Sequence, residues 1–207
     1  MRSVVEHLAW VVAMIYAAVP VFWFLVHPLV GFWRRQKRSP YWVLVPAQLA
    51  TIVLGLVLTW PWHRVTFYDT PYAWIAAMPF FVTAMSIFRR MKPHFTSQQM
   101  VGRNELAPDR FEQRLVTTGL HARVRHPIYG AHFLMLLGWT VGSGLLVCYA
   151  MVGFSLVAGT IMITLEEREL ERRFGEQWRE YKQRVPAFLP RRSGPAKPES
   201  SEAPRAL

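Results

Sequence analysis

The sequence predicts an all-α integral membrane protein, a helical bundle of about five spans followed by a C-terminal amphipathic helix. First, the chain of 207 residues is 52% hydrophobic. Second, its apolar residues form long blocks, and Asp, Glu, Lys and Arg are absent from residues 8–33, 39–62, 70–88 and 127–165. A membrane core of about 30 Å takes about 20 helical residues, so such blocks favour spans over buried core helices. Third, no segment alternates apolar and polar residues between hairpin turns, so strands are not expected.

The first three spans are expected at residues 8–28, 41–60 and 71–88. The first block is too long for an ordinary signal peptide, and Pro20 and Pro28 should kink or end its helix. Trp42 and Trp60 lie near the ends of the second span, where aromatic side chains favour the membrane interface. Arg89 and Arg90 set the end of the third span.

The fourth and fifth spans are expected at residues 128–142 and 145–165, joined by a turn at Gly142-Ser143-Gly144. The fourth is short for a full crossing. Residues 89–126 form a polar connection too long to be a simple turn, and loops of this length are usually functional or disordered. Residues 128–165 are long enough to cross the membrane and return, so both ends of this hairpin should reach the same surface.

The charged segment after the fifth span carries one apolar stripe. Its members recur at spacings of four, four, three and four residues: Leu170, Phe174, Trp178, Tyr181 and Val185. This pattern predicts a helix that lies on the membrane or closes over the site, or else a solvated continuation of the fifth span. Residues 1–190 are expected to form a single domain. Residues 191–207 are rich in Pro, Ser, Ala and charge and should form a disordered tail.

The charge distribution predicts the orientation. The net charge is +11, and 22 of the 24 Lys and Arg lie in residues 34–38, 89–126 and 166–207. Five spans put all three segments on one side, which the positive-inside rule assigns to the cytoplasm, with the N-terminus outside. The compartment expected is the bacterial inner membrane. Because topology and anionic lipid account for the basic excess, nucleic acid is not an expected partner. The single Cys148 cannot form an internal disulfide and should serve packing.

Two ionisable pairs bracket the hairpin and define a candidate site. Arg125 and His126 precede it and Glu166 and Glu167 follow it, so the two pairs should meet at one membrane surface. Ionisable groups near lipid are costly and suggest function. Arg and His can bind a carboxylate or stabilise a developing charge, and carboxylates can bind an ammonium or a sulfonium. A ligand carrying both signs, such as the amino-acid part of S-adenosylmethionine, would fit.

The start of the fourth span adds two groups to this site. Pro127 suits the first turn of a helix, and the free amides of that turn can hold an anion. Tyr129 lies one turn further on and offers a phenol. The alternative interpretation is that the basic pair only anchors the topology and the acidic pair makes surface salt bridges. A metal site is not expected, because His121, His126 and His132 lack the i, i+4 spacing of typical ligand pairs.

The C-terminal half resembles the isoprenylcysteine carboxyl methyltransferases and the related integral-membrane phospholipid methyltransferases. The resemblance covers residues 115–190. It rests on motifs that occur in the order of the family: Thr118-Gly119, then Arg125-His126-Pro127 and Tyr129, then Glu166-Glu167, Leu170, Phe174-Gly175, Trp178 and Tyr181. Two positions depart from the pattern, because many relatives have Gly-Pro-Tyr at residues 119–121 and Tyr at position 178. The first three spans resemble those of the family only in their apolar character.

The resemblance implies a membrane-embedded transferase that moves a methyl group from S-adenosylmethionine to a lipophilic acceptor. It assigns cofactor binding to His126, Pro127, Tyr129, Glu166 and Glu167, with Tyr181 covering the cofactor. Arg125 is the candidate for the polar end of the substrate and, with Tyr129, for a catalytic role. We expect Glu167 to matter more for cofactor binding than His121.

The acceptor stays open at this point. An isoprenylcysteine carboxylate needs no general base, whereas a phospholipid amine must lose a proton to Glu166, Glu167 or His126. A small apolar thiol is a third option. The soluble methyltransferase fold is disfavoured, because Gly142-Ser143-Gly144 is better explained as the hairpin turn. A membrane scaffold or transporter subunit is the non-enzyme alternative, although a transporter would more often show two similar halves, and no repeat occurs.

Overall fold

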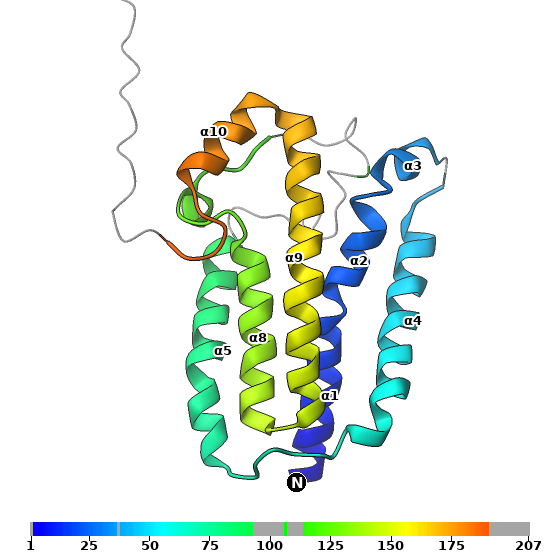
Figure 1. The fold of residues 1–207 in the computed structure, drawn as a ribbon, viewed down its shortest axis with the longest axis vertical. Helices are drawn as coiled ribbons and strands as arrows, with labels where there is room; N and C mark the ends of the chain where they lie inside the picture. The colour runs from blue at the N-terminus through cyan, green and yellow to red at the C-terminus, as the bar shows by residue number, and fades with distance from the viewer. Residues whose placement is uncertain (1, 37, 93–105, 107–113, 191–207) are drawn as a thin grey trace, which may run out of the picture.

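The computed structural model describes residues 2–36, 38–92, 106 and 114–190. Within these residues the regular structure is helical, with one isolated β-bridge between Thr66 and Leu145. The long helices stand side by side in an upright bundle (Figure 1). The predicted all-α class is therefore confirmed.

The first span is broken into two helices. α1 (Arg2–Ala17) and α2 (Val19–Val26) meet at Ala18, and Pro20, two residues later, lies in the first turn of α2. Together they supply an apolar segment, Val4–Val26, long enough to cross a membrane. The short α3 (Val30–Arg35) follows and ends in the first basic cluster. The proline-dependent break was expected from the sequence, because proline lacks the amide that a helix interior requires.

The second and third spans agree closely with the prediction. α4 (Tyr41–Thr59) leads into the short 3-10 helix η1 (Trp60–Trp62), and α5 (Tyr72–Met91) ends at the second basic cluster. α4 exposes a row of apolar side chains, which suits a surface that faces lipid: Leu49, Val53, Leu54, Val57 and Leu58.

The predicted hairpin is formed by α8 (Pro127–Ser143) and α9 (Leu146–Phe174). Gly144 ends α8 with a φ of 66°, a left-handed conformation that glycine adopts without steric cost. The loop before α5 holds this turn: the Phe67 amide donates to the Gly144 carbonyl at 2.8 Å, and the Leu146 amide donates to the Val65 carbonyl at 2.8 Å. The turn therefore lies where the sequence predicted it.

Glycine allows α8 to approach α5 closely. A Cβ at Gly138 would lie 2.6 Å from the ring of Phe81, and one at Gly142 would lie 2.4 Å from the ring of Trp74. Small residues at helix interfaces are typical of membrane bundles, in which packing rather than water exclusion holds helices together. Cys148 is fully buried beside this interface.

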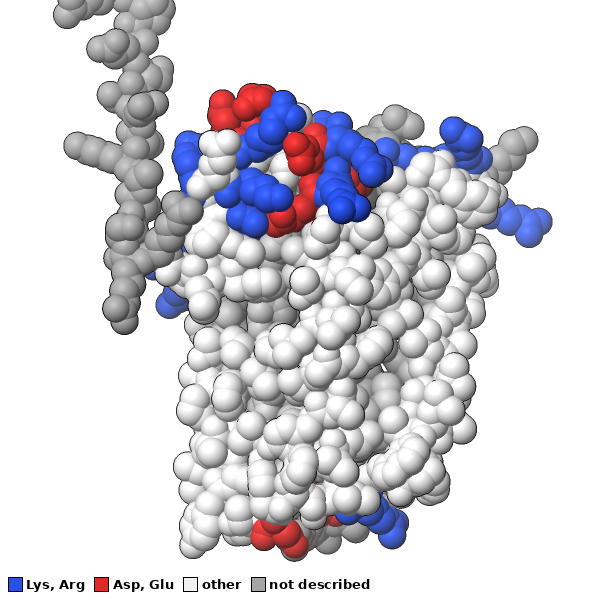
Figure 2. Space-filling model, viewed as in Figure 1, with Lys and Arg blue, Asp and Glu red and all other residues white. Residues whose placement is uncertain are grey.

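Charged side chains gather at the two ends of the bundle and leave a broad uncharged band between them (Figure 2). Four segments of the described chain are long and apolar enough to span a membrane: Val4–Val26, Tyr41–Trp62, Tyr72–Met91 and Leu146–Phe174. α8 has only 17 residues, as its predicted shortness suggested, and it lies between α5 and α9 and leads into α9 at the end of the bundle opposite α10 (Figure 1). The prediction of about five crossings agrees with this arrangement.

The C-terminal region differs from the prediction in one respect. α9 continues past the expected end of the fifth span at residue 165 to Phe174, as the alternative of a solvated continuation predicted, and a separate helix, α10 (Glu176–Arg184), follows the break at Gly175. The predicted single striped helix is thus divided between two helices, although its apolar side chains still pack together. The expected disordered tail at 191–207 and most of the polar connection at 89–126 lie outside the described residues.

Candidate active site

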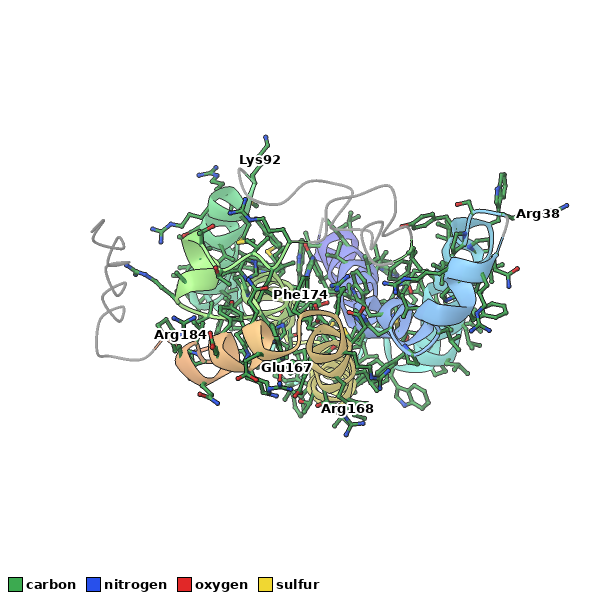
Figure 3. All side chains as sticks on the ribbon, turned by 90° about the horizontal axis from the view of Figure 1, so that it is seen from above. Arg38, Lys92, Glu167, Arg168, Phe174 and Arg184 are labelled. Atoms are coloured by element: carbon green, nitrogen blue, oxygen red, sulfur yellow. The ribbon has the colours of Figure 1, made fainter. Side chains whose placement is uncertain are left out.

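The two ionisable pairs meet at the end of the bundle that carries most of the charge. The first residues of α8 lie at this end, beneath α10, and the last turns of α9 stand beside α10 (Figure 1). Seen from above, Glu167 lies where α9 and α10 come together, whereas Arg168 points away from the bundle (Figure 3). The hairpin thus brings residues about 40 positions apart into direct contact, as the sequence predicted.

Glu167 is the centre of the contact. Its Oε1 atom accepts hydrogen bonds from Arg125 Nε at 3.0 Å and Arg125 Nη2 at 2.8 Å, and it lies 3.0 Å from His126 Nε2. Its Oε2 atom pairs with Lys182 Nζ at 2.8 Å. One carboxylate therefore joins the start of α8 to α10.

The cluster is largely shielded from solvent. The side chains of Arg125, His126 and Glu167 are 10%, 4% and 11% exposed. Charges removed from water are stable only when they are paired and hydrogen-bonded, and removal of one partner leaves the others uncompensated. Each member of the cluster is therefore held in place by the rest.

The chain after α10 lies across the start of α8. The backbone amides of Arg125 and His126 donate to the carbonyls of Pro186 and Ala187 at 2.8 and 3.0 Å. Arg125 Nη1 also donates to the carbonyls of Lys182, at 3.2 Å, and Val185. The guanidinium of Arg125 thus donates hydrogen bonds both to the carboxylate of Glu167 and to backbone carbonyls at the end of α10.

Tyr181 fixes α10 to the 3-10 helix η3 (Gly119–Ala122). Its hydroxyl donates to the carbonyl of His121 at 2.8 Å, and the ring is only 3% exposed. Burial raises the pKa of Tyr181 to about 12, so the phenol keeps its proton. His121 Nδ1 in turn lies 3.1 Å from the carbonyl of Arg125. Tyr181 therefore fixes α10 to the segment that precedes α8.

The remaining predicted residues surround His126. Pro127 occupies the first turn of α8, with His126 as the N-cap residue. The ring of Tyr129 stacks on that of His126 with centroids 5.8 Å apart. Glu166 Oε2 lies 3.9 Å from His126 Nδ1, on the side of the imidazole away from Glu167. The imidazole therefore stands between the two carboxylates.

The sequence did not indicate Lys182. It follows the striped residue Tyr181 and would ordinarily be assigned to a solvated face. It reaches Glu167 only because the chain turns at Gly175, which has a φ of 53° and a ψ of −123°, and α10 then runs beside the last turns of α9 (Figure 1). No local pattern encodes that contact, although a glycine directly after a helical run is a signal for such a break.

Within the described ranges, no group of three or more His, Cys, Asp and Glu has the geometry to hold a metal ion. The arrangement instead offers carboxylates, cations and an aromatic ring around one imidazole. Such a set can hold a small ligand that carries charges of both signs.

Comparison with known proteins gives relatives of two kinds. The chain is 34% identical over 82 residues to protein-S-isoprenylcysteine O-methyltransferase B of Arabidopsis thaliana, a match covering 37% of this chain and 40% of the relative. It is 37% identical over 81 residues to the protein-S-isoprenylcysteine O-methyltransferase of Xenopus laevis, covering 37% of this chain and 27% of the relative. It is 29% identical over 188 residues to methanethiol S-methyltransferase 1 of Bradyrhizobium diazoefficiens, covering 75% of this chain and 60% of the relative.

The resemblance to membrane methyltransferases predicted from the motifs is confirmed by these matches. The chain spans less than two thirds of the length of each of these relatives. No family model matches it, and no solved structure gives a significant match.

Proposed function

We propose that this protein is a membrane-embedded methyltransferase that transfers a methyl group from S-adenosylmethionine to a lipophilic acceptor. The observation that carries the proposal is the buried contact of Arg125 and His126 with Glu167 at one end of a membrane bundle. The sequence similarity to methyltransferases that act on isoprenylcysteine and on methanethiol supports the same reaction class.

The residues of the site fit the proposed cofactor. S-adenosylmethionine supplies an activated methyl group on a sulfonium and carries an amino-acid moiety with one ammonium and one carboxylate. Glu166 and Glu167, which Arg125 and His126 hold in position, would bind the positive groups, and the backbone amides of the first turn of α8 at Pro127 would hold the carboxylate. Tyr129, stacked on His126, offers an aromatic face, and a positive sulfonium is attracted to such a face. Tyr181 would cover the cofactor by holding α10 in place.

A carboxylate is the acceptor group that this site suits best. It is ionised at neutral pH and needs no general base, whereas an amine or a thiol must first lose a proton. Glu167 is a poor proton acceptor, because both of its oxygens already bind cationic side chains. Exclusion of water and correct positioning of the reactants would then supply most of the rate enhancement. The side chains of Arg125 and His126 are shielded from solvent, so the site that they line can exclude water and hold the reactants in place. The lead candidate is therefore an isoprenylcysteine-like carboxylate.

A thiol is the second candidate acceptor. The Bradyrhizobium relative, which is named for methanethiol, matches 75% of this chain, twice the share matched by the isoprenylcysteine enzymes. Turnover of an S-prenylated cysteine but not of small apolar thiols would favour the carboxylate reading, and the reverse result would favour the thiol. A phospholipid amine is the third case to include in the same assay.

We place the site on the cytoplasmic side of a bacterial inner membrane, with the N-terminus outside. The basic ends of α3 and α5 lie at the same end of the bundle as the site, which agrees with the positive-inside rule. The cofactor would arrive from water and the acceptor sideways from lipid.

Calorimetric binding of S-adenosylmethionine to the full chain in detergent tests the proposal. We expect micromolar affinity in the unaltered protein and its loss when Glu166→Gln and Glu167→Gln are combined. The matched control combines Glu171→Gln and Glu176→Gln, which removes two carboxylates from α9 and α10 that pair with the exposed Arg179. This control should bind the cofactor normally.

Absence of binding to folded, unaltered protein would favour the non-enzyme alternative, a membrane scaffold or transporter subunit. Equal loss in the double variant and in the control would also contradict the assignment of the cofactor to Glu166 and Glu167, because it would reflect net charge alone.

A further inference from the structure

Two arginines near the end of α9 take no part in the candidate active site. Arg168 and Arg172 are both exposed, and neither makes a hydrogen bond or an ion pair with the described part of the chain. The carboxylates of Glu169 and Glu171, which lie between them in the sequence, pair with other arginines. Within the described residues, the two guanidinium groups therefore have no counter-charge.

The spacing of Arg168 and Arg172 suits a single bound anion. Side chains four residues apart in a helix are neighbours on one face, with Cβ atoms about 6 Å apart, and two like charges so placed destabilise the helix. A guanidinium donates charge-assisted hydrogen bonds to phosphate, often two at a time. One phosphate between the two side chains would therefore replace a repulsion by two favourable contacts.

The same side of α9 continues away from the arginines as an exposed apolar stripe. Phe154, Val157 and Ile161 are 49%, 64% and 51% exposed, and they precede Arg168 by about two to four helical turns. Thr164 lies between Ile161 and the arginines, and its hydroxyl donates to a backbone carbonyl of the same helix at 2.8 Å. That hydroxyl needs no further polar partner, so the stripe can face hydrocarbon.

The length of this stripe matches one leaflet of a membrane. At about 1.5 Å per residue, Phe154 lies about 21 Å along the helix from Arg168, whereas the hydrocarbon of one leaflet is about 15 Å thick. Basic side chains at this end of the bundle stand directly above the uncharged band (Figure 2). A molecule with its anionic group at the arginines would therefore have apolar surface beside the whole of its hydrocarbon chain.

We propose that Arg168 and Arg172 bind the phosphate of an anionic phospholipid, phosphatidylglycerol, whose acyl chain lies along Phe154, Val157 and Ile161. Charge complementarity selects this lipid, because a zwitterionic headgroup would bring a second positive charge to the arginines. The site is separate from the methyl-transfer site, since Arg168 points away from the bundle (Figure 3). It does not depend on the proposed function.

Native mass spectrometry of the full chain, released from neutral detergent, tests the proposal. Phosphatidylglycerol and phosphatidylcholine with identical acyl chains compete for the protein, and we expect about a tenfold preference for phosphatidylglycerol. Arg168→Gln combined with Arg172→Gln should reduce this preference to about twofold or less.

The matched control combines Arg89→Gln and Arg90→Gln. It removes the same charge from two exposed positions on α5, at the same end of the bundle. Adjacent residues of a helix do not face each other, so this pair is not placed to share one phosphate. The control should keep the preference for phosphatidylglycerol, whereas a general attraction of anionic lipid to the basic end predicts equal losses in both double variants.

A photoreactive phosphatidylglycerol with a diazirine in the middle of one acyl chain locates the bound lipid. It should label the α9 segment from Phe154 to Ile161 in the unaltered protein and label it less when Arg168 and Arg172 are both replaced by Gln. That double variant should bind S-adenosylmethionine as the unaltered protein does. If neither protein binds S-adenosylmethionine but the lipid preference and its loss are found, only the proposed function fails.

The inference is overturned if the unaltered protein does not prefer phosphatidylglycerol, or if the two double variants lose the preference equally. It is also overturned if Val157→Cys, introduced into a Cys148→Ala background, forms disulfide-linked dimers in the membrane, because a second copy of the chain would then cover the stripe. Labelling that avoids the segment from Phe154 to Ile161 would likewise contradict the assignment of the acyl chain.

Discussion

Among individual residues, Glu167 determines how the site is built. Both of its oxygens are occupied, by Arg125 and His126 on one side and by Lys182 on the other. A cofactor ammonium that binds Glu167 must therefore share or displace Lys182, the only one of these three partners that is substantially exposed, at 45%. In the proposed complex, Lys182 would occupy the position of the positive group of the ligand.

Lys182→Met should therefore tighten the binding of S-adenosylmethionine. An exposed ion pair contributes about 0.2–1 kcal/mol, so removal of the competing ammonium should lower the dissociation constant by up to about fivefold. Calorimetry measures the change directly. Arg184→Met is the control, because it removes one positive charge from an exposed position on the same helix, where the side chain contacts only the Glu180 carbonyl among the described contacts. If Lys182→Met weakens binding instead, Lys182 orders α10 and does not compete.

Among the elements, the break between α9 and α10 positions the cover of the site. Gly175 has a φ of 53° and a ψ of −123°, a region that residues with a side chain rarely adopt. The reversal there brings Tyr181 to His121 and Lys182 to Glu167. A straight continuation of α9 would carry both side chains away from α8.

Gly175→Ala should release α10 from the site. No neighbouring atom lies within 4 Å of a Cβ at this position, so the cost is conformational, about 1–3 kcal/mol. Hydrogen exchange should become faster in α10, and cofactor affinity should fall. Gly159→Ala is the matched control, because Gly159 lies inside α9 with open space around it and should gain up to about 1 kcal/mol of helix stability. Unchanged protection of α10 in Gly175→Ala would show that other contacts suffice to hold it.

In the whole molecule, the site depends on an odd number of crossings. The N-terminus lies at the end of the bundle opposite the site (Figure 1), and each later span reverses direction. The basic ends of α3 and α5 and the start of α8 consequently share one surface with α10. The number of crossings is odd only because the short helix α8 is one of them.

Single-cysteine labelling tests the topology. Replacement of Cys148, which is buried and unpaired, gives a background without thiols. An impermeant maleimide should reach Ser39→Cys and Arg184→Cys only from the cytoplasmic face and Thr70→Cys only from the outer face. All three positions are exposed. Labelling of Ser39→Cys and Arg184→Cys from opposite faces would contradict the five-span arrangement and separate the site from the basic end of the first span.

The sequence alone determined the helical class, the positions of the spans and the meeting of Arg125-His126 with Glu166-Glu167. Charge-free blocks of about 20 residues have few stable alternatives to membrane helices. The turn at Gly142-Ser143-Gly144 then returns the second arm of the hairpin to the surface that the first arm left. These features follow from chain length and from local residue preferences, which are visible in a sequence.

Only the tertiary structure decided which groups surround that meeting point. Lys182 reaches Glu167 because the backbone turns at Gly175, and Arg34 at the end of α3 comes within 3.8 Å of Glu169 on α9. The sequence assigned the stripe from Leu170 to Val185 to one helix, since its spacing is helical throughout and one backbone reversal leaves that spacing intact. Contacts between distant segments depend on how helices are placed against one another, and no local pattern in the chain encodes that placement.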